Sequence, residues 1–353
     1  MHENNTQIRH ALLRWFSENK RPLLWRKTKD PYHIWLSEII LQQTRVAQGT
    51  PYYQRFINHY PTIQQLAEAP EQEVLKLWQG LGYYSRARNL HATAKIITEK
   101  FKGRFPETFK EIISLKGIGD YTAAAILSIA FNQPHAVLDG NVYRVLSRLY
   151  LIQTPINARE AKAIFQQQAQ ELLDKTQPGD FNEAMMEFGA TICLPKNPLC
   201  HICPLQTYCE AFALGKVNEL PKKLPAKKAR ARYFHYLVIT ENNGVYLKER
   251  VAGDIWQGLF DFPLVEKTTP ETLHKTDIEE QLHIYSIEKM LPVYKTKHQL
   301  THQTLFITFY ESNDTKLPGS SYIHVPLKML HDYPVPKPVE FFLKEYLHKP
   351  GLF

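Results

Sequence analysis

The sequence lacks an apolar stretch long enough to cross a bilayer. Its longest apolar run, near Ala123–Phe131, falls far short of the roughly 20 residues that a membrane-spanning helix needs. The N-terminal segment also lacks the continuous apolar core of a secretory signal, because its apolar residues recur at helical spacing instead (Ile8, Leu12, Trp15, Phe16). We therefore expect a cytoplasmic protein of bacterial type.

Cysteine is scarce, and all four cysteines lie within residues 193–209. Without an export signal, metal binding is a more expected use of these thiols than disulfide formation. Their spacing, C-x6-C-x2-C-x5-C, contains a single short C-x2-C pair, whereas structural zinc sites usually contain two short pairs. Four thiolates in one compact loop suit a [4Fe–4S] cluster, so the spacing favours iron–sulfur and leaves zinc as the alternative. The ligands would be Cys193, Cys200, Cys203 and Cys209.

Acidic residues are outnumbered by basic ones, 35 against 43, which gives a formal net charge of +8 and a pI near 9.1. This balance favours a polyanionic partner such as nucleic acid. Part of the excess lies in residues 216–232, KVNELPKKLPAKKARAR, where bulky apolar residues are few. This composition indicates a basic linker, which either lies near a phosphate backbone or is an ordinary solvated connection.

The hydrophobic period changes along the chain. Helical patterns dominate up to residue 215, and short β-type runs follow from residue 233. We expect helices after Asp30-Pro31 and at 52–58, 71–79, 84–100, 108–115, 271–282 and 339–347, and strands at 233–240, 245–250, 294–300 and 304–310. The fold class is therefore mainly α, with a helical domain at 1–215, a linker at 216–232 and a smaller α+β domain at 233–353.

The helix after Asp30-Pro31 carries a carboxylate in an apolar setting. Asp30 suits the N-cap and Pro31 the first helical position. Apolar residues surround this helix almost completely, so we expect it in the interior, with Glu38 on the face of Ile34 and Leu41. Burial disfavours a charged carboxylate and should raise the pKa of Glu38. The alternative is a glutamate satisfied by a salt bridge or by solvent.

Two G-x-G turns are candidate nucleic-acid contacts. Gly117-Ile118-Gly119 feeds a helix, and the free N–H groups at such a turn suit a phosphate, although many such turns only join helices. Residues 80–84, GLGYY, present two tyrosines that could stack on bases or pack in a core. Asp139 precedes another helical pattern and suits its N-cap. Lys196, between two cysteines on a proline-stiffened loop, is a further candidate for a phosphate contact.

Six motifs in order carry a family resemblance. They are SEIILQQT, GLGYYSRARNL, LKGIGDYTAAA, LDGNVYRVLSRL, FNEAMMEFGA and the four-cysteine pattern. Together, over about residues 8–215, they closely resemble the adenine DNA glycosylases of the MutY family, within the helix-hairpin-helix base-excision superfamily. Residues 233–353 resemble, more weakly, the family's C-terminal domain, a relative of Nudix hydrolases. The resemblance implies a [4Fe–4S] cluster and a monomer that acts on double-stranded DNA, at the nucleoid, where adenine is paired with 8-oxoguanine or guanine.

The resemblance also implies residue roles. Glu38 matches the general acid that protonates N7 of a flipped adenine, and Asp139 matches the carboxylate that stabilises the oxocarbenium-like sugar. Tyr121, Asn141 and Glu183 match the groups that support this aspartate and the attacking water. The expected DNA contacts are Trp25, Arg26 and Leu41 in the adenine pocket, Gln43, Thr44, Leu81 and Tyr83 on the opposite strand, and Gly117 and Gly119 on a phosphate.

One feature separates this chain from a neighbouring group, and two others depart from the pattern of the families that it resembles. Tyr121 stands where the endonuclease III-type lyases have the lysine that forms a Schiff base, so the resemblance implies a monofunctional glycosylase. The alternatives are such a bifunctional lyase and a non-catalytic iron–sulfur DNA-binding protein. The Phe-Ser-His element that senses 8-oxoguanine corresponds here to Leu300-Thr301-His302, which keeps a hydroxyl and loses an aromatic ring. A Nudix metal-binding box is absent from the sequence, so we expect the second domain to recognise DNA without hydrolysing nucleotides.

Overall fold

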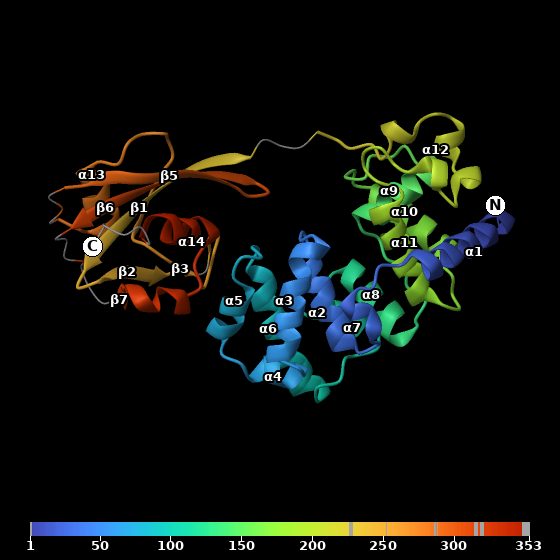
Figure 1. Ribbon diagram of the computed structural model, residues 1–353, viewed down its shortest axis with the longest axis horizontal. Helices are drawn as coiled ribbons and strands as arrows, with labels where there is room; N and C mark the ends of the chain where they lie inside the picture. The colour runs from blue at the N-terminus through green and yellow to red at the C-terminus, as the bar shows by residue number, and fades with distance from the viewer. Residues whose placement is uncertain are drawn as a thin grey trace. The chain divides into compact units, whose positions relative to one another are not determined.

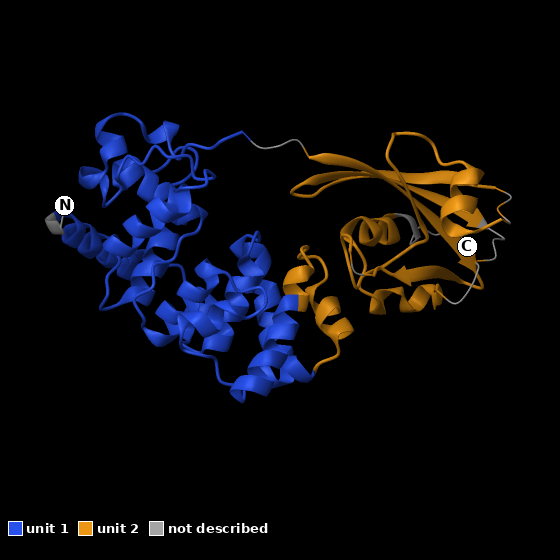
Figure 2. Cartoon of the chain, turned by 180° about the vertical axis from the view of Figure 1, so that it is seen from behind, with its two compact units in different colours: residues 1–68, 89–226 blue, residues 69–88, 227–353 orange. Residues whose placement is uncertain are grey.

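The chain folds as two compact units. The computed structural model describes residues 2–225, 229–251, 253–285, 287, 289–313, 317 and 321–347, so residues 226–228 of the expected linker lie outside the described residues. One unit comprises Met1–Glu68 and Asn89–Ala226, and the other comprises Ala69–Arg88 and Lys227–Phe353 (Figure 2). Residues 69–88 therefore belong with the C-terminal sheet. None of the described helices is long and apolar enough to cross a membrane.

Helices build nearly all of the first unit (Figure 1). Helix α5 (Glu71–Trp78) lies in the second unit, and α6 (Ser85–Phe101) begins there and continues into the first. The other helices up to residue 215 are α1 (His2–Asn19), α2 (Pro31–Leu41), α3 (Val46–His59), α4 (Ile63–Glu68), α7 (Phe109–Ile113), α8 (Asp120–Phe131), α9 (Gly140–Leu149), α10 (Ala161–Leu172), α11 (Pro178–Thr191) and α12 (Glu210–Ala213).

Helix α2 begins as its sequence predicts. The side chain of Asp30 accepts a hydrogen bond from the backbone N–H of Tyr32 at 2.8 Å, and Pro31 occupies the first turn. Tyr32 and all residues from Ile34 through Ile40 are buried, including the Glu38 side chain, so the predicted place of the helix in the interior is confirmed.

Two helix starts differ from the prediction. Helix α3 begins at Val46, and Pro51 lies inside it. A proline inside a helix removes one backbone hydrogen bond and usually disfavours the helix, so the sequence pattern did not predict a helix that continues through Pro51. Helix α13 (Lys275–Leu282) begins four residues later than expected, because the His274 N-cap and Asp277 form a capping box.

The second unit contains a seven-stranded sheet. Its strands are β1 (Arg230–Glu241), β2 (Gly244–Glu249), β3 (Phe260–Asp261), β4 (Leu264–Lys267), β5 (Leu291–Gln299), β6 (Gln303–Asn313) and β7 (Ile323–Pro326). The path runs β3-β2-β1-β6-β5, with β4 paired to β1 and β7 to β2; β1 and β6 are parallel and the other pairs antiparallel. The four predicted strands are confirmed, whereas β3, β4 and β7 are too short to show a period of two.

Helices cover both faces of this sheet. Alternate residues of β1 point to opposite sides: Phe234 and Tyr236 pack with α14 (Lys337–Phe342), and Leu237 and Ile239 pack with α13. A π-helical turn, Leu343–Leu347, extends α14 over the rest of the helix predicted at 339–347. Each face thus has its own apolar core.

The expected linker is largely anchored at both ends. The guanidinium of Arg148 donates to the carbonyls of Val217 and Leu220 at 3.0 and 3.1 Å, and Asn157 exchanges two hydrogen bonds with the backbone of Leu224. At the other end, β1 already begins at Arg230. Arg232 is only 7% exposed and ion-paired, so this basic residue is neither a solvated linker side chain nor free for a phosphate.

Close helix packing predicts one stability effect. A Cβ added at Gly179, near the start of α11, would lie 2.7 Å from the carbonyl oxygen of Ser128 and 2.9 Å from Cα of Ile129, both backbone atoms of α8. We expect Gly179→Ala to lower the free energy of unfolding by about 1–3 kcal/mol, because the two helices must separate. Urea denaturation measures this. Gly119→Ala is the control, since its Cβ would meet nothing within 4 Å; equal stabilities for the two variants would contradict the packing argument.

Candidate active site

A cavity of about 460 Å³ opens in the helical unit, a volume in the range of small-ligand pockets. It is lined by residues from α2, α8, α9 and α11 and from the segment before α2. Every catalytic residue expected from the sequence lines it, as do several of the expected DNA contacts: Glu38, Tyr121, Asp139, Asn141, Glu183, Trp25, Arg26, Leu41, Gln43 and Thr44. Residues that are far apart in sequence thus meet around one space.

Glu38 reaches the cavity from the middle of α2 and is 8% exposed. Burial raises the pKa of its carboxyl to about 7, because the surrounding apolar helix disfavours the charged form. A hydrogen bond from Tyr121 and the charge of Arg26 oppose this rise in pKa, and the carboxylates of Asp139 and Glu183 reinforce it. The predicted upward shift is confirmed, and Glu38 can hold a proton near neutral pH.

Tyr121 lies on α8 beside Glu38. Its hydroxyl donates to Sδ of Met186 at 3.2 Å and also interacts with the Glu38 carboxyl, so two acceptors compete for one proton. Burial, with the neighbouring carboxylates Glu38 and Asp139, raises the pKa of Tyr121 well above its ordinary value. The hydroxyl therefore stays protonated and acts as a donor.

Asp139 is the N-cap of α9, as its position in the sequence predicts. Its Oδ1 accepts from the backbone N–H groups of Asn141 and Val142 at 3.0 and 2.8 Å, and its Oδ2 accepts from the Asn141 side chain at 2.8 Å. Burial raises the pKa of Asp139, while these three donors and Arg144 oppose the rise by stabilising the anion. Asp139 thus both caps α9 and lines the cavity.

Two arginines and two glutamates form a partly buried network at one side of the cavity. The guanidinium of Arg26 donates to Glu183 at 2.9 Å and to Glu187 at 3.0 Å. Arg21 binds both oxygens of Glu187, at 2.5 and 2.8 Å. Sequence reasoning missed Arg21 and Glu187, although Glu187 follows Glu183 by four residues and so lies on the same helix face.

The Gly117 turn lies before α8, as expected for a turn that feeds a helix. Gly117 has φ of +77°, a backbone conformation that favours glycine, and a Cβ there would lie 2.7 Å from Cβ of Asn89. A Cβ at Gly119 would meet nothing within 4 Å, so the turn is open on that side. Lys196 is exposed on the cysteine loop.

The remaining expected DNA contacts belong to the second unit. Tyr83 is 49% exposed, and its hydroxyl lies 3.0 Å from Oγ1 of Thr301. Thr301 and His302 are exposed at the turn between β5 and β6. Leu81 is buried at 6% exposure, whereas its neighbour Tyr83 points outward. Tyr83 and Thr301, predicted separately as readers of the opposite strand, are thus in direct contact.

The four cysteines line a cavity of their own. Cys193, Cys200, Cys203 and Cys209 surround it together with Arg148, whose guanidinium lies 3.3 Å from Sγ of Cys193. Four thiols around one shared cavity fit an iron–sulfur cluster that is ligated by four cysteines.

The glutamate network predicts a stability effect. Glu187 is 1% exposed, so Glu187→Ala would leave the guanidinium groups of Arg21 and Arg26 without their shared buried acceptor. We expect Glu187→Ala to lower the free energy of unfolding by about 3 kcal/mol, as measured by urea denaturation. Asp180→Asn, on the same helix, is the control: its pair with Lys29 is 4.0 Å long and exposed, so a change within about 0.5 kcal/mol is expected. If Glu187→Ala lowered the free energy of unfolding no more than the control did, the network would not contribute to stability.

Family models match three segments of the chain. Residues 36–171 match the HhH-GPD superfamily base excision DNA repair protein, residues 193–209 the iron–sulfur binding domain of endonuclease III, and residues 235–345 the NUDIX domain. The predicted fold class is confirmed. The match over residues 193–209 confirms that the cysteine loop is an iron–sulfur binding motif, which contains Cys193, Cys200, Cys203 and Cys209.

Solved structures share the fold of the helical half. A thermostable thymine-DNA glycosylase matches with a TM-score of 0.56 and 29% identity, over 60% of this chain and 98% of its own. A non-covalent endonuclease III–DNA complex matches with a TM-score of 0.51 over 60% of this chain and 97% of its own, and its 23% identity supports the fold alone.

Curated relatives match most of the chain. An adenine DNA glycosylase of Buchnera aphidicola subsp. Baizongia pistaciae is 38% identical over 84% of this chain and 83% of its own length. Another, from Buchnera aphidicola subsp. Schizaphis graminum, is 35% identical over 94% and 96%. The human adenine DNA glycosylase is 44% identical over 58% of this chain and 39% of its own length. From the fold, the iron–sulfur motif and relatives that match nearly its whole length, the chain belongs to the adenine DNA glycosylase family.

Proposed function

We propose that this protein is a monofunctional DNA glycosylase that removes adenine paired with 8-oxoguanine, or with guanine, from duplex DNA. The observation that carries the proposal is the meeting of Glu38, Tyr121 and Asp139 in one cavity. The family supports adenine as the substrate, because its curated members are adenine DNA glycosylases. The 8-oxoguanine partner rests on the sequence resemblance and on the exposed pair of Tyr83 and Thr301.

The chemistry would need the target nucleotide outside the duplex. A flipped adenine enters the cavity, which Trp25 and Leu41 line with apolar surface. Glu38 donates its proton to N7 of adenine, and the glycosidic electron pair leaves with the neutral base. Positive charge develops at C1′ of the sugar, where the Asp139 anion stabilises it. Water then adds to C1′, and the proton that it loses returns to Glu38.

The neighbouring residues are consistent with Glu38 as the proton donor and Asp139 as the stabilising anion. The two N–H groups and the Asn141 amide bound to Asp139 favour its anion, while burial favours the acid form of Glu38. Glu183, held by Arg26, is available to orient the base or the water. Tyr121 has no amine, so no Schiff base and no strand cleavage are expected from it. The cluster would be structural or redox-active, because four thiolates leave no position open for substrate.

The two parts of the chain would share the recognition of DNA. We propose that the helical domain, residues 1–215, binds DNA and hydrolyses the glycosidic bond, and that the α+β domain, residues 233–353, recognises the base opposite adenine. Residues 216–232, of which the last three already belong to β1, would join them. Gly117, Gly119 and Lys196 would bind phosphates, and Gln43, Thr44, Leu81, Tyr83, Thr301 and His302 would face the opposite strand. The protein would act on chromosomal DNA as a monomer.

Adenine release tests the proposal. With a duplex that carries 8-oxoguanine opposite adenine, wild-type protein should release adenine, and Glu38→Gln should be slower by about 10²–10⁴-fold, because an amide donates no proton to the leaving base. Glu99→Gln, an exposed glutamate of α6, should match the wild type. Chromatography of the released base measures the rate. An inactive wild type, or an unimpaired Glu38→Gln variant, would overturn the proposal, and a borohydride-trapped adduct would favour the lyase alternative.

The rate should depend on pH through Glu38. Its pKa near 7 lies above the ordinary value of 4.5, so the catalytic acid is protonated below about 7 and is lost as pH rises. We expect the single-turnover rate to fall about tenfold per pH unit above that point. Tyr121→Phe removes a hydrogen bond that lowers the pKa of Glu38, so the falling limb should move to higher pH. A rate that stays flat to pH 9 would contradict the role of Glu38.

A further inference from the structure

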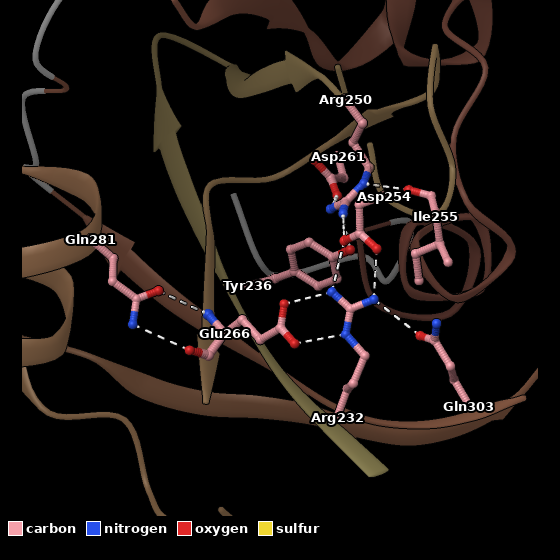
Figure 3. Close-up of polar contacts among 9 residues, drawn as sticks. All are labelled: Arg232, Tyr236, Arg250, Asp254, Ile255, Asp261, Glu266, Gln281 and Gln303. Carbon is pink, nitrogen blue, oxygen red and sulfur yellow. Dashed lines mark hydrogen bonds and ion pairs between the residues drawn. The ribbon is translucent and has the colours of Figure 1, made fainter. Parts of the chain in front are cut away.

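Arg232 is the centre of a polar cluster in the second unit (Figure 3). It lies at the start of β1, and its guanidinium binds both oxygens of Asp254, each at 2.7 Å, and both oxygens of Glu266, at 2.7 and 2.6 Å. It also donates to Oε1 of Gln303 at 3.0 Å. One buried cation thus joins β1, β4, the first residue of β6 and the loop that follows β2.

Gln303 belongs to the turn that carries Thr301 and His302. We call residues 299–303 the β5–β6 turn. Leu300 N–H donates to the carbonyl of Gln303 at 2.8 Å, which closes the turn, and Arg230 N–H donates to the carbonyl of His302 at 3.0 Å. Arg230 and Gln303 are register partners of β1 and β6. The start of β1 therefore contacts the turn that carries the exposed Thr301 and His302 in two places, through the backbone N–H of Arg230 and through the side chain of Arg232.

The loop that contains Asp254 supports the same turn. Arg250 donates to the carbonyl of Ile255 at 2.9 Å and to Asp254 at 2.8 Å, so two arginines hold this loop. Ile255, Trp256 and Leu300 all pack against the core on this face of the sheet, and the Trp256 ring lies 5.9 Å from that of His298 on β5. Release of Asp254 would therefore loosen the packing beneath the turn as well as the turn itself.

We propose that Arg232 is a positioning residue that helps the protein to discriminate between 8-oxoguanine and guanine opposite adenine. It would do so by fixing the β5–β6 turn through Gln303 and Asp254. The inference rests on the proposed function. Arg232 does not touch DNA itself, because it is buried and its donors bind protein acceptors. Its role is to hold Thr301 and His302 in a single geometry, so that a hydrogen bond to 8-oxoguanine is made without further ordering of the turn.

The charge and shape of arginine explain why this position is sensitive. A planar guanidinium can bind two carboxylates in bidentate fashion and still reach an amide, whereas lysine offers one point charge. Without the arginine, Asp254 would keep its ion pair with Arg250, but the bidentate link between Asp254 and Glu266 would be lost. The loop and the base of the turn would then move apart. Among the residues that the structure describes, those that line the catalytic cavity all belong to the other unit, so the chemistry of adenine removal should persist.

The ratio of two rates tests this inference. Adenine release from 8-oxoguanine:A and from G:A duplexes is measured with full-length, iron-loaded protein under single-turnover conditions at low enzyme concentration. For Arg232→Lys we expect the 8-oxoguanine preference to fall about tenfold, equivalent to about 1.4 kcal/mol, with the G:A rate preserved. Gln303→Leu, which removes only the contact to the turn, should lower the preference in the same direction and by a smaller factor.

The control breaks a comparable ion pair in the same domain away from the turn. Lys267 on β4 binds Asp277 of α13 at 2.9 Å, so Lys267→Met should lower thermal stability without altering the preference. An equal loss of preference in Lys267→Met would mean that general destabilisation is the cause. An unchanged preference in both Arg232→Lys and Gln303→Leu would overturn the positioning role. If Arg232→Lys fails to fold, Gln303→Leu decides alone, whereas a wild type without activity on either duplex would refute the proposed function instead.

Discussion

The structure depends on the removal of one carboxyl group from water. Glu38 lies in a helix that is buried along most of its length, and burial raises its pKa to about 7. The energetic cost of burying this group is lowest when it is protonated, which is also the state in which it can donate to a leaving base. Nearby, Asp139 receives three hydrogen bonds that favour its charge. Burial thus raises the pKa of both carboxyl groups, and at Asp139 the donated hydrogen bonds oppose the rise.

Buried arginines hold the parts around these sites. In the helical unit, Arg26 joins Glu183 to Glu187, and in the second unit Arg232 joins Asp254 to Glu266. Arg148 likewise joins the cysteine loop to the start of the linker, because its guanidinium contacts both Cys193 and Val217. A guanidinium has five donors in one plane, so a single side chain can fix segments that are distant in sequence. The positive formal charge of the chain is therefore partly internal and is not all available to DNA.

Much of the fold could be predicted from local pattern. The start of α2 at Asp30-Pro31, the burial of Glu38, the Asp139 cap and the four longer strands follow from spacing and residue type, which act within a few residues. The errors also have local causes: Pro51 lies inside α3 although proline usually disfavours a helix, and β3, β4 and β7 are too short to show alternation of apolar and polar residues. Family resemblance identified the cavity residues, which spacing alone would have left as separate candidates.

The sequence by itself determined which groups are present: two carboxyl groups in different settings, a tyrosine in place of a lysine, and four closely spaced thiols. Only the tertiary structure decided which of them meet. The sharing of Arg26 by Glu183 and Glu187, and the contact of Tyr83 with Thr301, join residues whose separation in sequence carries no periodic signal. The same holds for Arg232, which looked like one more basic linker residue. Its role depends on acceptors 22, 34 and 71 positions away, and proximity of that kind arises only when the chain has folded.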